Sequence, residues 1–253
     1  MAELRRLVPL GLFFGLLALT AGCAREVQPK IVKGVDACAA CNMVIDQVNQ
    51  SCGYVLEGEF VPFDSPGCLL RSFDARRKSG AGLPERIYFA DYRDGSFHPA
   101  DSTLFLLTGH VPTVMNARVI CFSDSGGAEE ARRYPDEILT DWLGYRTLRG
   151  TPDEVVRISL DENGMQPEVV QVDKGDLVLW VVRGHDLRGP LTISIKGYPE
   201  VGTVIVPPDG GEVNFRLMAL RPGAGFPVLS GETGRPLGML KVTGAHTLDE
   251  QEM

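Results

Sequence analysis

The sequence predicts an α+β domain followed by an all-β sandwich, and patterns in the two halves of the chain carry this prediction. Residues 36–148 mix short strands with isolated helix signals and lack the regular alternation that builds a parallel sheet, which favours an α+β domain. Residues 151–246 contain short alternating or apolar segments, separated by turn residues at roughly ten-residue spacing, which is typical of a sandwich. The length of 253 residues allows two modest domains.

The N-terminus has the pattern of a secretory signal peptide. Two arginines precede the apolar run Leu7–Leu19, which is shorter than the roughly 20 residues that a membrane span needs. Small residues then lead to Cys23, as in the bacterial lipobox. We therefore expect Met1–Gly22 to be a lipoprotein signal peptide, Cys23 to be lipidated and residues 23–35 to be a tether; an ordinary secreted protein is the alternative. We expect the mature protein to be periplasmic and lipid-anchored to a bacterial membrane, in an oxidising compartment.

Charge and composition exclude one class of partner. The formal net charge is −8, with 44% hydrophobic and 23% charged residues, which is an ordinary globular composition. The chain has no basic run and no stripe of interleaved basic and aromatic residues. We therefore expect no nucleic-acid partner.

Three sulfur atoms are concentrated in the stretch Asp36–Ile45. It contains Cys38, Cys41 and Met43. Thiolate and thioether ligands together select Cu(I), whereas zinc takes thiolate but has little use for methionine. The stretch therefore favours a copper site; the alternative is a disulfide between the two cysteines with the methionine in a core.

The number of cysteines leaves at least one thiol unpaired. After Cys23 the count is odd, so an internal disulfide pairing cannot be complete. A c-type haem is excluded, because Asn42 and not histidine follows the second cysteine of the C-x-x-C motif. The five cysteines are Cys38, Cys41, Cys52, Cys68 and Cys121.

The first domain contains one strong helix signal. Asp64-Ser65-Pro66 predicts a helix start with an N-cap at one of the first two residues and proline at the first helical position, and the helix should run to about Lys78. Cys68 then lies in the first turn, where amide dipoles lower a thiol pKa; it is alternatively a small buried residue. A short helix is also predicted from Gly127 to Arg133. The predicted strands are Cys52–Leu56, Phe60–Phe63, Ile87–Tyr92, Thr103–Leu107, Val111–Val114 and Arg118–Phe122.

Four segments of this domain together resemble a known family. They are Cys38-Ala-Ala-Cys41-Asn-Met43, Phe63-Asp64-Ser65-Pro-Gly67-Cys68, Phe89-Ala90-Asp91-Tyr92 and Thr113-Val114-Met115-Asn116-Ala-Arg-Val-Ile-Cys-Phe122. Their order and spacing resemble the NosL family, lipid-anchored copper-binding accessory proteins of nitrous oxide reductase assembly. The resemblance covers residues 36–148, with Asn42 where that family usually has glycine and Val114 where it often has proline.

The resemblance implies a Cu(I) site built from both ends of this domain. Cys41 and Met43 would supply a thiolate and a thioether, Met115 would come from the far end, and Cys38 and Cys68 are further candidates. It also implies a metallochaperone, not an enzyme, that passes Cu(I) on by ligand exchange. The partners would be nitrous oxide reductase and its assembly proteins, an ABC transporter and a periplasmic β-helix protein.

The second half is divided by turns into eight predicted strands. The segment Met165–Asp176, with Leu-Val-Leu-Trp following, and the ending Gly238-Met239-Leu-Lys-Val resemble the cupredoxin family, which implies a Greek-key sandwich. Residues 247–253 are expected to form a tail. The predicted strands are Val155–Leu160, Val169–Val172, Leu177–Val182, Leu191–Ile195, Gly202–Val206, Glu212–Leu217, Gly225–Leu229 and Gly238–Val242.

The electron-transfer copper site of cupredoxins does not carry over to this sequence. That site needs a cysteine with histidine partners, and no cysteine follows Cys121. In the ligand loop only Met239 matches, and His185 precedes the strand where the first histidine is expected. The second domain is therefore expected to serve in docking or scaffolding, with a weaker copper site at His185 and Met239 left open.

Other functions remain open at this point. Cys38 and Cys41 could act as a thiol–disulfide oxidoreductase, although the motif lacks the usual strand-then-helix context. A structural lipoprotein with two disulfides is another possibility. Because the sandwich is not part of the NosL pattern, the client could also be another copper enzyme, such as a terminal oxidase.

Overall fold

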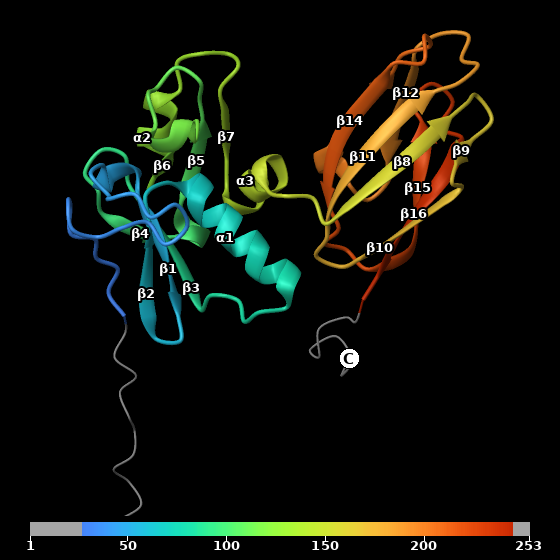
Figure 1. Ribbon diagram of the computed structural model, residues 1–253. Helices are drawn as coiled ribbons and strands as arrows, with labels where there is room; N and C mark the ends of the chain where they lie inside the picture. The colour runs from blue at the N-terminus through green and yellow to red at the C-terminus, as the bar shows by residue number, and fades with distance from the viewer. Residues whose placement is uncertain (1–26, 245–253) are drawn as a thin grey trace, which may run out of the picture.

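The computed structural model describes residues 27–244, which are mostly β-strand with few helices (Figure 1). The predicted signal peptide Met1–Gly22, the lipidation site Cys23 and the tail 247–253 lie outside the described residues. Within the described range, no helix is both long and apolar enough to cross a bilayer.

The first sheet is antiparallel and has the strand order β2-β1-β3-β4. Glu57 and Gly58 form the two-residue loop that joins β1 to β2. Both residues have positive φ, because a two-residue hairpin loop must match the twist of its strands. This hairpin delivers the end of β2 to the start of the first helix. The strands are β1 (Cys52–Leu56), β2 (Glu59–Phe63), β3 (Arg86–Ala90) and β4 (Phe97–Pro99).

Helix α1 (Pro66–Ser79) begins where the sequence predicts it. Ser65 is the N-cap, and its Oγ accepts a hydrogen bond from the backbone N of Cys68 at 3.4 Å. Pro66 occupies the first position, where a missing N–H costs nothing. The helix ends at Gly80, whose left-handed φ of 68° is the usual helix terminator.

A second antiparallel sheet has the order β6-β5-β7. The prediction of a strand at Val111–Val114 is wrong, because β5 already has a partner on each edge. That segment instead leads into a 3₁₀ turn, Val114–Asn116, in which Met115 has a φ of 54°. The elements here are β5 (Leu104–Leu107), β6 (Val119–Phe122), α2 (Ser125–Ala131), β7 (Ile138–Thr140) and α3 (Trp142–Arg149).

Helix α3 contributes its aromatic residues to the core of this first region. The Tyr145 ring stacks on Phe105 with centroids 4.9 Å apart, and Tyr145 is buried. Trp142 contacts the rings of Phe73, Phe89 and Phe105. Both aromatic residues of α3 therefore belong to the core of the first region.

The rest of the described chain forms two facing sheets of orders β14-β11-β8-β9 and β10-β16-β15-β12-β13. In β8 buried and exposed residues alternate, so one face packs into a shared core around the fully buried Trp180. The strands are β8 (Glu154–Leu160), β9 (Met165–Gln166), β10 (Val169–Asp173), β11 (Leu177–Gly184), β12 (Leu191–Ile195), β13 (Val204–Val206), β14 (Glu212–Met218), β15 (Gly223–Ser230) and β16 (Pro236–Thr243).

Polar contacts join α1 to the sandwich, and Figure 1 shows this helix on the side of the first region that faces it. The Arg77 guanidinium donates to the Asp153 carboxylate. Asp153 also accepts from the backbone N of Leu177 at 2.8 Å. In the opposite direction, the backbone N of Thr151 donates to Asp74 Oδ2 at 2.7 Å. The sandwich thus holds the C-terminal half of α1.

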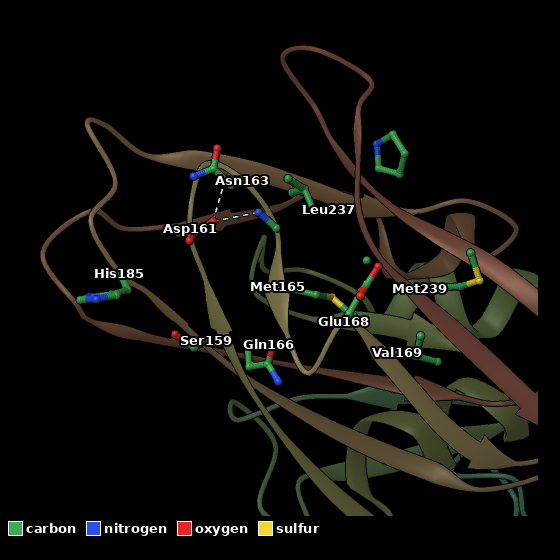
Figure 2. A pocket seen from close by; sticks show the side chains of 13 residues that line it. Ser159, Asp161, Asn163, Met165, Gln166, Glu168, Val169, His185, Leu237 and Met239 are labelled. Carbon is green, nitrogen blue, oxygen red and sulfur yellow. Dashed lines mark hydrogen bonds between the residues drawn. The ribbon is translucent and has the colours of Figure 1, made fainter.

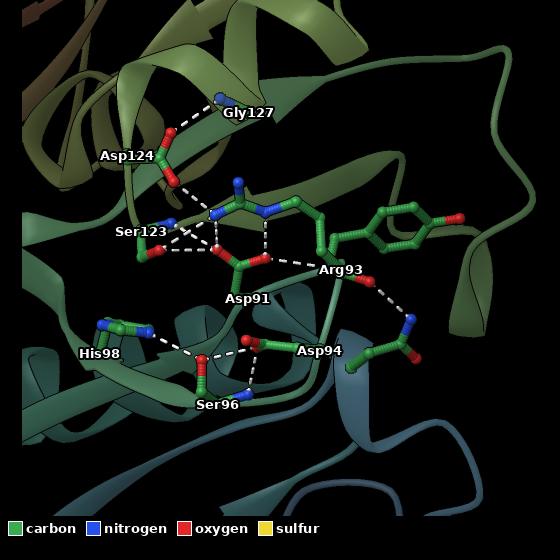
Figure 3. A network of polar contacts seen from close by, with 10 residues as sticks. Asp91, Arg93, Asp94, Ser96, His98, Ser123, Asp124 and Gly127 are labelled. Carbon is green, nitrogen blue, oxygen red and sulfur yellow. Dashed lines mark hydrogen bonds and ion pairs between the residues drawn. The ribbon is translucent and has the colours of Figure 1, made fainter.

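A buried carboxylate links the ends of β3 and β6 (Figure 3). Asp91 is 2% exposed and accepts from Arg93 N, Nε and Nη2 at 2.9, 3.0 and 2.8 Å. It also accepts from the backbone N and Oγ of Ser123, both at 2.8 Å. The Arg93 guanidinium, helped by these backbone and hydroxyl donors, holds the pKa of Asp91 far below its usual value against the opposing effect of burial.

This network predicts acid sensitivity. Because the folded-state pKa of Asp91 is depressed, its contribution to stability is complete above the unfolded pKa of about 4 and is lost as the pH falls below it. The urea concentration at the midpoint of unfolding should therefore decrease as the pH is lowered from about 5 to about 3. In Asp91→Asn the same midpoint should decrease less steeply. Equal slopes for the two proteins would show that the carboxylate is not the group responsible.

Candidate metal centre

The C-x-x-C motif lies in the loop of a tight hairpin. Ala37 and Val44 form an antiparallel bridge, and the backbone N of Cys38 donates to the Met43 carbonyl at 2.8 Å. Asn42 N closes the loop by donating to the Cys38 carbonyl at 2.8 Å, with a left-handed φ of 60° at Asn42. Asparagine is one of the few residues besides glycine that adopts this conformation readily.

Two contacts hold this loop against the first sheet and α1. The backbone N of Ala39 donates to the Pro62 carbonyl in β2 at 2.9 Å. The Cys41 thiol donates to Asp64 Oδ2 at 3.2 Å. Asp64 follows directly on β2, and Cys68 lies in the first turn of α1, so the sheet and helix bring the hairpin and both of these residues together.

These elements gather four potential ligands in one cluster. Sulfur atoms of Cys38, Cys41 and Cys68 and a carboxylate oxygen of Asp64 all lie within 4.8 Å of one another. Ligand atoms of a tetrahedral zinc–thiolate site, at about 2.3 Å from the ion, lie roughly 3.8 Å apart. Only Cys41 is partly exposed; the other three are buried. The cluster is therefore compact enough to close around one metal ion and open on one side.

The cluster also has a cationic neighbour. Arg71, one turn after Cys68 in α1, donates from Nη2 to Cys68 Sγ at 3.0 Å. A guanidinium in this position offsets the negative charge that a thiolate acquires on binding a metal. Arg71 itself is solvent-exposed, so the charge is supplied without burying a second ion.

Burial favours the protonated form of two thiols in the cluster. Burial, and then the hydrogen bond to Asp64, raise the pKa of Cys68 to about 12. The prediction that the helix N-terminus lowers this pKa is therefore wrong, because desolvation outweighs the amide dipoles. Burial also raises the pKa of Cys41. Metal binding must displace these protons.

The pKa of Asp64 shifts in the opposite direction. Burial alone would raise the pKa of its carboxyl group, but hydrogen bonds from the thiols of Cys68, Cys41 and Cys38 and from Ser65 outweigh burial and lower it. Ser65 Oγ donates to Asp64 Oδ1 at 3.2 Å. The cluster therefore favours the ionised form of this carboxyl group.

The predicted site residues are placed as follows. Cys41, Cys38 and Cys68 come together. Asp64, for which the sequence predicts only helix capping, is the fourth member of the cluster. Met43 and Met115 are 51% and 49% exposed, and their role as copper ligands stays a prediction. The loop of Met115 does approach the site, because Ala117 lies beside Gly67, next to Cys68. Cys52 and Cys121 are buried free thiols outside the cluster.

The two candidate ligands in the sandwich border one pocket but are not brought together. A cavity of about 560 Å³ is bordered by both His185 and Met239. In Figure 2 these side chains lie at opposite ends of it, with Met165 and Glu168 between them. His185 Nε2 instead lies 3.2 Å from the carboxylate of Asp186. The second copper site left open by the sequence therefore has no ligand set here.

Comparison with known proteins finds only partial structural similarity. No model of a protein family and no curated protein matches the chain. The similar solved structures are cupredoxin-like folds and a copper-binding domain. The metal-binding domain of the Cu(I)-exporting P-type ATPase CopA from Streptococcus pneumoniae, with Cu(I), is 18% identical, over 38% of this chain and 100% of that one, with a TM-score of 0.29. Reduced auracyanin from Roseiflexus castenholzii is 15% identical, over 38% and 100%, with a TM-score of 0.29. A purple cupredoxin from Nitrosopumilus maritimus is 15% identical, over 35% and 99%, with a TM-score of 0.26.

Proposed function

We propose that this protein binds Cu(I) at the thiol cluster and passes it to a copper enzyme. The observation that carries the proposal is the approach of three cysteine sulfurs, from a hairpin and a helix, to within 4.8 Å of one another. Thiolates, with thioethers from Met43 and Met115, form the soft donor set that favours Cu(I) over harder ions.

The exposure of the ligands supports transfer rather than permanent storage. Cys41 is partly exposed, while Cys38 and Cys68 are buried, so an incoming sulfur ligand can reach the ion from one side and replace Cys41 first. The half-exposed Met43 and Met115 offer thioethers outside the buried pair. Stepwise replacement of ligands needs no substrate turnover, so the protein acts as a metallochaperone and not as an enzyme.

The client follows from the resemblance of residues 36–148. A lipid-anchored periplasmic protein with this pattern would deliver copper to nitrous oxide reductase, in company with an ABC transporter and a β-helix assembly protein. A terminal oxidase is the other client class, because the additional sandwich lies outside that pattern.

A thiol–disulfide oxidoreductase is less well supported by the geometry. The C-x-x-C motif lies in a hairpin loop, not at the start of a helix. Burial raises the pKa of Cys41, whereas an attacking cysteine is activated by a lowered pKa.

An anaerobic titration tests the proposal. The reduced protein competes with a chromophoric chelator for Cu(I), and we expect one tightly bound equivalent. Met43→Ala and Met115→Ala should each weaken binding by about tenfold or more if the thioethers contribute. Undiminished binding in both variants would restrict the ligands to the thiols, and absence of a tight equivalent in the unmodified protein would refute Cu(I) binding.

A further inference from the structure

The cluster contains a fourth donor that Cu(I) does not need. Asp64 places a carboxylate oxygen within 4.8 Å of all three sulfurs and is 2% exposed. Carboxylate oxygen is a poor ligand for Cu(I) but an ordinary one for Zn(II), which takes thiolate and carboxylate in tetrahedral sites.

We infer that this centre also binds a divalent thiophilic ion of the Zn(II) class, in four-coordinate geometry, with Asp64 as the fourth ligand beside Cys38, Cys41 and Cys68. The inference rests on the same residues as the proposed function but does not depend on Cu(I) transfer. The three thiols release their protons to the solvent as the ion enters.

The carboxylate is oriented for this role. Its Oδ2 accepts a hydrogen bond from the Cys41 thiol at 3.2 Å, and its Oδ1 accepts one from the Ser65 hydroxyl at 3.2 Å. One oxygen thus faces the sulfurs and the other is held by a hydroxyl outside the cluster, which is the arrangement that orients a metal-ligating carboxylate.

The total charge of the site differs between bound Cu(I) and a bound divalent ion. Three thiolates and one carboxylate carry a formal charge of −4, which Cu(I) would reduce only to −3 and a divalent ion to −2. The Arg71 guanidinium, 3.0 Å from Cys68 Sγ, contributes one further positive charge. Because buried, uncompensated charge is strongly unfavourable, full four-ligand coordination suits the divalent ion, and Cu(I) should bind through sulfur alone.

Cobalt(II) provides the probe, because its absorption reports coordination number and thiolate ligation. The reduced full-length protein, titrated with Co(II), should show thiolate charge-transfer bands and intense tetrahedral d–d bands that saturate at one equivalent, and Zn(II) should displace them. Asp64→Asn keeps the size of the side chain and should weaken Co(II) and Zn(II) binding about tenfold or more. Its Cu(I) affinity should change less than about threefold.

Asp46→Asn, on the exposed part of the same hairpin, is the matched control and should bind all three ions normally. Absence of tetrahedral bands in a protein that binds Cu(I) would overturn the inference and leave the proposed function intact. Equal weakening of Cu(I) and Co(II) by Asp64→Asn would also overturn it, since the carboxylate would then not discriminate between them. Thermal unfolding of the apo-proteins checks that the variants fold.

Discussion

Replacing Cys41 by serine should lower the affinity for Cu(I) by at least about 100-fold, which corresponds to about 2.8 kcal/mol. The substitution removes one of three sulfurs that lie within 4.8 Å of one another and leaves a hydroxyl, which is a hard ligand. The measurement is anaerobic competition with a chromophoric Cu(I) chelator. The fold should tolerate the change, because Cys41 is partly exposed and serine can still donate to Asp64, as the thiol does at 3.2 Å.

Cys121→Ala is the control for this experiment. Cys121 is a buried free thiol in β6, outside the four-residue cluster. Its removal should cost stability through a small cavity but leave Cu(I) affinity within about threefold of the unmodified protein. If Cys41→Ser bound Cu(I) normally while Cys121→Ala did not, the copper site would lie deeper in the domain than the hairpin.

Local signals of capping and alternation could predict much of this fold. Proline after serine predicted the start of α1 correctly, because capping depends only on neighbouring residues. In the second half, the alternation of apolar residues marked most strands to within a few residues, as at β8 and β12. The sequence pattern does not predict the short β9 or the parallel pairing of β10 with β16, because register across distant segments is set by tertiary contacts.

For the site, too, local features are predictable from the sequence and features that depend on tertiary contacts are not. The concentration of sulfur in the hairpin was visible in the sequence, but Asp64 was not identified as a ligand candidate, since an aspartate before a serine and a proline has an adequate explanation as a capping residue. Helix position also predicts the wrong direction for the pKa shift of Cys68, because it does not show that the thiol is buried. A buried carboxylate facing three thiols exists only once β2, α1 and the hairpin meet.

The contact between α1 and the sandwich should matter for stability and not for metal affinity. Asp153→Ala should lower the free energy of unfolding by about 2 to 4 kcal/mol, and the melting temperature by roughly 5 to 10 °C. Asp153 and Arg77 side chains are only 14% and 20% exposed, so the variant leaves a largely buried guanidinium unpaired. Among the described residues, Arg77 Nε already lacks a hydrogen-bond partner, and the backbone N of Leu177 would lose its acceptor as well.

The exposed pair of Arg183 and Glu212 provides the comparison. Its side chains are 62% and 49% exposed, so Arg183→Ala should cost less than about 1 kcal/mol. Asp153→Ala should still bind Cu(I) with an affinity within about threefold of normal, because Cys68 lies in the first turn of α1 and Arg77 lies in the last. A melting temperature unaffected by Asp153→Ala would mean that the sandwich does not support α1. A large loss of Cu(I) affinity in a folded variant would instead mean that the contact with the sandwich positions Cys68 at the other end of α1. The sandwich would then support the metal site.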